Sequence, residues 1–150
     1  MTKKQQSLVE QTKQKVKETF EETKDKTKDT YNKVLDTEID DAQKQVKQWL
    51  SLVDAQNYEA SWERAGTFFK QQVTISQWQS AAQKVHKSFG AVQSRSVQSA
   101  TATTDVPGAP DGSYVIFVFH TTFTHKQKAV ETVTAIEEMG AWHVVGYFVR

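Results

Sequence analysis

The sequence predicts an α+β protein, with a long N-terminal helix and two further helices packed on one face of a four-stranded antiparallel meander sheet. Helical periodicity, with apolar residues three or four positions apart, extends through the first 90 residues. From residue 91 onward the period changes to two, and Val, Ile, Thr and Phe become frequent. Turn signals separate the later apolar runs, which indicates strands joined to their neighbours.

The first helix is expected from about residue 6 to about residue 55, because no Gly or Pro occurs before Gly66. Its first part carries an 11-residue repeat, TKQKVKETFEE at 12–22 and TKDKTKDTYNK at 23–33. Eleven residues are close to three helical turns, so equivalent positions return to one face. That face is narrow and weakly apolar. Its strongest anchors are Phe20, Tyr31, Leu35 and Ile39.

The composition divides the chain into an arm and a globular domain. Residues 1–45 hold 10 apolar residues, whereas residues 46–150 hold 46. We therefore expect a polar helical arm over 1–45 and an α+β domain over 46–150. The net charge of +1 argues against general nucleic-acid binding, and the lack of cysteine excludes thiolate chemistry. No apolar run is long enough to span a membrane, and the first residues lack the apolar stretch of a signal peptide.

In the expected domain, residues 46–54 complete the first helix. A second helix is expected over 58–72, and a third starts with Ser76 as its N-cap and ends near Gly90. Four strands follow. They are expected at 91–105, 113–123, 129–138 and 142–149, with turns at 107–112, 125–128 and 139–140.

Alternation along these strands assigns side chains to two faces of the sheet. The face expected to meet the helices collects Val97, Val115, Phe117, Phe119, Val133, Ala135, Val145 and Tyr147. The opposite face collects Ala100, Ala102, Ile116, Val118, His120, Ile136, Val144 and Phe148. This outer face is unusually apolar for a surface in contact with water, which predicts an interaction there.

Several spaced motifs of the globular part agree with one bacterial family. They are Trp49-x-x-Leu52-Val-Asp54, Tyr58-x-x-Ser61-Trp62, Gln77-Trp78, Pro107-Gly-x-Pro-Asp-Gly112-x-Tyr114 and the run from Gly140 to Phe148. Over roughly Val46 to Val149 the chain resembles domain-of-unknown-function family 4019. The resemblance implies a small exported α+β protein, in the periplasm or cell envelope if a leader was removed and in the cytoplasm otherwise. It supplies no catalytic residues.

Catalytic and metal motifs are not found in the sequence. The four histidines lack the spacing of a helical metal site, and no nucleophile elbow, phosphate loop or dinucleotide fingerprint occurs. We therefore expect no catalytic residue, no cofactor and no metal. Arg95 and Glu131 share the helix-facing side of the sheet, which predicts a structural ion pair. The alternative is that Arg95 binds an anionic or carboxylate ligand.

These observations favour a non-catalytic interaction or assembly module that self-associates, or binds another protein, through its helical arm. The expected interface comprises Phe20, Tyr31, Leu35, Ile39, Ile116, Val118 and Phe148. One alternative is a periplasmic or envelope protein that binds a small ligand between sheet and helices. Another is an enzyme of the cone-shaped α+β class. The arm could also remain solvated, or touch a lipid surface, because its repeat resembles those of synucleins and late-embryogenesis-abundant proteins.

Overall fold

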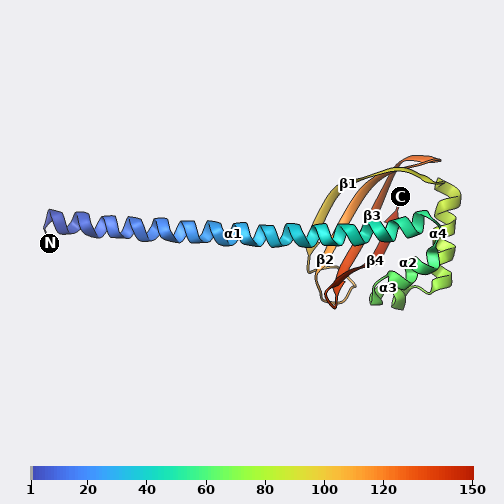
Figure 1. Cartoon of the computed structure of the whole chain (residues 1–150), viewed down its shortest axis with the longest axis horizontal. Coiled ribbons are helices and arrows are strands. Elements are labelled where there is room, and N and C mark those ends of the chain that lie inside the picture. Colours follow the sequence, from blue (N-terminus) through green and yellow to red (C-terminus); the bar gives the residue numbers. More distant parts are fainter. Residues whose placement is uncertain (1) are drawn as a thin grey trace. The chain divides into compact units, whose positions relative to one another are not determined.

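The computed structural model describes residues 2–150, apart from the side chains of residues 4, 19–23 and 25. It confirms the α+β class and the four-stranded antiparallel sheet (Figure 1). The elements are α1 (Lys3–Asp54), α2 (Tyr58–Arg64), α3 (Thr67–Gln72), α4 (Ile75–Phe89), β1 (Val92–Thr103), β2 (Tyr114–Phe123), β3 (Lys126–Glu138) and β4 (Ala141–Val149).

The chain divides into two units, residues 1–37 and residues 38–150. The N-terminal part of α1 forms the first unit, and the second unit contains the rest of α1 and every other element. The boundary lies before the one expected after residue 45, because α1 enters the core early. Ala42 and Val46 are fully buried, and Ile39 packs against the same core.

The segment expected as one helix over 58–72 is instead two short helices, α2 and α3. The helix is interrupted at Gly66, whose N–H donates to the carbonyl of Val144 on β4 at 2.7 Å. A Cβ at Gly66 would lie 2.5 Å from Val145 Cγ1, so this approach to β4 requires glycine. The carboxylate of Glu138 accepts from the Thr67 N–H at 3.0 Å, which satisfies a free donor at the start of α3.

The third expected helix, α4, begins slightly earlier than predicted. Its N-cap is Thr74 rather than Ser76, since the Thr74 hydroxyl accepts from the Gln77 N–H at 3.2 Å. The Gln77 side chain accepts from the Thr74 N–H at 2.9 Å, which completes a capping box. The helix ends as expected before Gly90, whose φ of 81° is readily adopted only by glycine.

The strands follow the order β1-β2-β3-β4, and each of the three pairings contains at least one register shift. The register shifts between Val97 and Ser99, so that Ala100 faces Phe117 and packs against the core. A second shift places Val144 opposite Ala135, and Val144 is only 2% exposed. The prediction that Ala100, Ala102 and Val144 lie on the outer face was therefore wrong, because a bulge reverses the alternation beyond it and pairs Ala102 with the core residue Val115.

The core lies between the helices and one face of the sheet. At its centre Trp49 from α1 contacts Trp78 from α4 and Tyr147 from β4, with ring centroids 5.4 and 5.6 Å apart. Phe69 from α3 completes this aromatic group, edge-on to both tryptophans. Large aromatic side chains contribute much of the apolar burial in a small domain, so this group fills the space between helices and sheet.

The outer face of the sheet keeps apolar side chains at its surface. Ile116 and Val118 are half-buried, and Phe148 is 62% exposed. Ile136 is 6% exposed, because the turn before β2 covers it at Gly112. The helices of residues 38–150 contribute their buried residues to the core on the other face. A strip of accessible apolar side chains therefore crosses the outer face from β2 to β4, with Thr132 and Thr134 of β3 among them.

Candidate functional site

The structure brings Arg95 and Glu131, the two residues expected to pair, into direct contact. Arg95 Nε donates to Glu131 Oε1 at 2.7 Å, and Nη2 donates to Oε2 at 3.2 Å. Asp54 forms a second bidentate pair with the same guanidinium, at 2.8 Å from Nη1 and 3.0 Å from Nη2. One guanidinium thus joins two carboxylates.

Glu131 is the buried centre of this cluster and is 0% exposed. The hydroxyls of Thr121 and Tyr147 also donate to its carboxylate, so four donor groups from three residues surround it. Burial, and then the charge and hydrogen bond of Glu131, raise the pKa of Tyr147 far above its usual range. Burial alone would lower the pKa of Arg95, but its two carboxylate partners raise it overall. Every neighbour that contacts the Glu131 carboxylate in this cluster therefore donates a hydrogen bond to it.

The cluster joins α1 to all four strands, since Asp54 is the last residue of α1 and the other members come from β1, β2, β3 and β4. A carboxylate at a helix C-terminus opposes the helix dipole, and the Arg95 charge offsets this. Asp54 also occupies the guanidinium edge that a carboxylate ligand would need. The geometry thus favours a structural cluster over an anion site. The third partner was missed because Asp54 is remote from both strands in the sequence.

A small cavity of about 30 Å³ lies beside this cluster. Asp54, Tyr58, His86 and Tyr147 are among the residues that line it. The Tyr58 hydroxyl is buried and has no hydrogen-bond partner in the part of the chain that the structure describes. Burial raises the pKa of Tyr58. Two tyrosines of one cavity therefore differ: the hydroxyl of Tyr147 is paired, and that of Tyr58 is not.

This difference predicts opposite effects of removing the two hydroxyls. Tyr147→Phe takes a donor from the buried Glu131 carboxylate and should lower the free energy of unfolding by about 1.5–3 kcal/mol. Tyr58→Phe removes an unpaired buried hydroxyl and should leave that free energy unchanged or raise it by about 1 kcal/mol. Urea denaturation of both variants measures the two effects. An equal loss in both would contradict the assignment.

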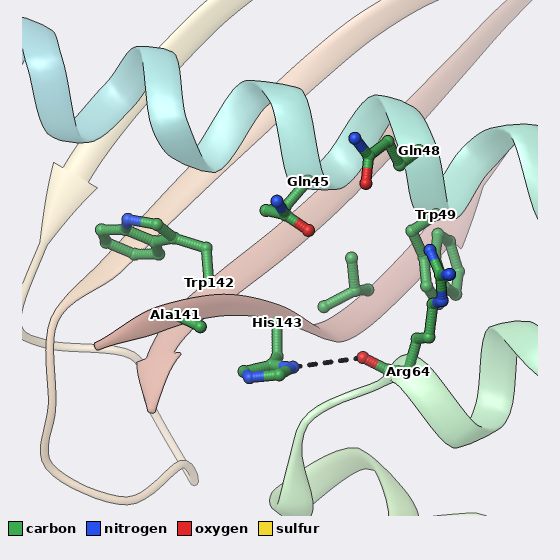
Figure 2. Close-up of a pocket in the computed structure, with 8 residues that line it drawn as sticks. Gln45, Gln48, Trp49, Arg64, Ala141, Trp142 and His143 are labelled. Carbon is green, nitrogen blue, oxygen red and sulfur yellow. Dashed lines mark hydrogen bonds between the residues drawn. The ribbon is translucent and has the colours of Figure 1, made fainter. Parts of the chain in front are cut away.

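A larger pocket of about 210 Å³ opens where the C-terminal part of α1 passes the start of β4. Figure 2 shows Gln45 on α1 above Trp142 and His143 on β4. The Nδ1 atom of His143 lies 3.3 Å from the carbonyl oxygen of Arg64, at the end of α2. Tryptophan rings, the side-chain amides of Gln45 and Gln48, and the cationic side chain of Arg64 therefore line one pocket.

The remaining histidines do not assemble into a site. His86 is half-buried beside the small cavity, whereas His120 and His125 are exposed. Among the residues that the structure describes, no group of three or more His, Asp or Glu side chains is placed to hold a metal ion.

The residues expected to form an assembly interface differ in their surroundings. Tyr31 is 64% exposed and Leu35 is half-buried, whereas the side chain of Phe20 lies outside the described residues. Ile39 packs against the core of residues 38–150, so its place in the expected interface is not supported. Further apolar side chains on the arm are exposed. They are Leu8 (65%), Val9 (43%), Val16 (65%) and Val34 (54%).

The fold and its filled aromatic core define a small α+β protein built on a four-stranded antiparallel sheet. The model of a family described as "Protein of unknown function (DUF4019)" matches residues 45–147. The chain belongs to the DUF4019 family, as its spaced motifs indicated. No curated protein matches the chain. In the described part of the chain, no helix is both long and apolar enough to cross a membrane.

Proposed function

We propose that this protein is a non-catalytic assembly module, whose arm (residues 1–37) associates with a second copy through its apolar stripe. The observation that carries the proposal is the exposure of this stripe. Leu8, Val16, Tyr31 and Val34 are each more than half exposed on one helix. Exposed apolar side chains repeated along one helix face favour a partner that covers them.

The energetics support association of moderate strength. An isolated helix gains little stability from its own hydrogen bonds, and most helices are stabilised by packing of an apolar face. Full burial of one Val, Leu or aromatic side chain contributes about 1.5–3 kcal/mol before entropy is subtracted. The four exposed side chains therefore suffice for a reversible complex. The stripe has too few apolar side chains to form an obligate interface as apolar as a domain core.

Two surfaces could receive the arm of a second copy. One is the stripe of that copy's own arm, which would produce a helix pair. The other is the accessible strip of the outer sheet face, where Ile116, Val118 and Phe148 lie. We propose the first as the primary contact, because two copies of the same stripe present the same exposed apolar side chains to each other over the same length of helix.

A non-catalytic role is supported by the chemistry of the buried polar groups. The Glu131 carboxylate is surrounded by donors, and Arg95 is engaged by two carboxylates. Neither group therefore has a free edge for a substrate. The aromatic group around Trp49 packs together between the helices and the sheet, so side chains fill that space.

A pair of substitutions with a matched control tests this function. Val16→Lys with Tyr31→Lys places two charges in the stripe, whereas Gln11→Lys with Asn32→Lys places two on the charged face of the same helix. Loss of the stripe should weaken association at least about tenfold, since about 1.4 kcal/mol corresponds to a factor of ten. Multi-angle light scattering over a concentration series measures it. Equal association of both variants, or a wild type that stays monomeric at millimolar concentration, would refute the proposal.

A further inference from the structure

A groove follows α1 within residues 38–150, beyond the pocket of Figure 2. A neighbouring hollow of about 360 Å³ shares Gln45, Ala141 and Trp142 with that pocket, so the two form one continuous groove. Its α1 wall extends from Glu38 to Gln48. Ten residues of helix correspond to about 15 Å.

The two ends of this groove carry opposite charge. Glu38, Asp41 and Glu137 line one end, together with a single cation, Lys44. Arg64 lines the other end. The structure places none of these five charged side chains in an ion pair with another described residue. Both ends therefore present charge that a ligand can neutralise.

The middle of the groove offers free hydrogen-bonding groups and the exposed edge of a largely buried aromatic ring. That ring is Trp142, which is 9% exposed, packs in the core and lines both hollows between the charged ends. Gln45 and Gln48 stand on one wall, and neither amide has a hydrogen-bond partner among the described residues. Each amide can both donate and accept, as a peptide group does. The opposite wall is the start of β4, the last strand in the sheet order.

We propose that this groove binds an extended peptide segment of a partner protein. A basic side chain of the peptide lies at the acidic end, and an acidic side chain pairs with Arg64. Between them an apolar side chain contacts the exposed edge of Trp142. An extended chain advances about 3.3 Å per residue, so a segment of four or five residues spans the α1 wall of the groove. The carbonyl of Val144 already accepts from Gly66, which limits the strand pairing to the first residues of β4.

The groove suits an extended peptide better than the helical arm of a second copy. Backbone groups of an extended segment are unpaired and can use the two glutamine amides and the β4 edge. In a helix the backbone N–H and C=O groups are already paired with each other. A basic and an acidic side chain of a bound helix would also need to be about ten residues apart to reach both ends of the groove. This peptide site is therefore distinct from the stripe proposed for assembly.

The test is a titration of the full ¹⁵N-labelled chain with designed pentapeptides, followed by NMR. The peptides carry Lys or Arg at one end and Asp or Glu at the other, in both orders, with Val, Leu, Phe or Trp between them. A matched set has Gln at both ends. We expect the charged set to bind at least tenfold more tightly, and to shift the Trp142 indole and the Gln45 and Gln48 amide signals.

Charge reversal supplies the decisive comparison. Arg64→Glu should weaken the base–acid peptides at least tenfold and should favour peptides with Lys at both ends. Arg150→Glu makes the same change at another exposed arginine and should alter the affinity for neither kind of peptide. The proposal is overturned if no charged peptide binds more tightly than the Gln set, or if Arg64→Glu leaves the peptide affinities unchanged. It is also overturned if the groove signals of the protein without peptide change on dilution as the arm of a second copy leaves the groove.

Discussion

Glu131→Gln is expected to lower the free energy of unfolding by about 3–5 kcal/mol, because it removes one partner of a buried ion pair. The carboxylate is 0% exposed and receives donors from Arg95, Thr121 and Tyr147. An amide has one acceptor oxygen in place of two, and its NH₂ group would face donors. Arg95 would retain only Asp54, which is nearer to solvent.

Thermal and urea denaturation followed by circular dichroism measure this loss. For a unit of this size the melting temperature should fall by at least about 10 °C. Glu137→Gln is the matched control, because it makes the same change at an exposed position of the same strand and should have little effect. A melting temperature that is unchanged in Glu131→Gln would show that the pair contributes nothing to stability.

Deletion of residues 2–37 is expected to leave a folded, monomeric protein. The core of residues 38–150 includes residues from α1, α4 and the sheet, and none of its buried residues comes from the described side chains of the deleted segment. The melting temperature should therefore change little, whereas concentration-dependent association should disappear with the stripe. Light scattering and thermal denaturation of the truncated and full chains give both results.

A longer deletion shows where the arm ends. Removing residues 2–43 also takes away Ile39, which packs against the core, and the fully buried Ala42. Truncation of a buried Ile to Ala alone typically lowers the free energy of unfolding by about 2–5 kcal/mol. The protein that lacks residues 2–43 should therefore be clearly less stable than the full chain. If both truncated proteins were equally stable, or if the shorter deletion still self-associated, the division between arm and domain would be wrong.

Part of the polar cluster could be anticipated from residue order. Alternation along the strands placed Arg95 and Glu131 on the helix-facing side with opposite charge. Asp54 could not be assigned in this way, because its contact depends on where α1 ends relative to β1. The unpaired state of the Tyr58 hydroxyl likewise depends on neighbours from several elements, and residue spacing does not specify it.

The sequence by itself determined the order of helices and strands, the position of the turns and the polar character of the arm. These properties follow from local periodicity, from glycine and proline, and from composition, all of which act over a few residues. Only the tertiary structure decided the break at Gly66, the inward position of Ala100 and Val144, and the pairing of Arg95 with a second carboxylate, Asp54. Each depends on atoms distant in the chain: a carbonyl on β4, a bulge that reverses a strand's faces, and a carboxylate at the end of α1. The physical reason is that strand register and close packing are set by the whole fold, whereas periodicity reports only the local chain.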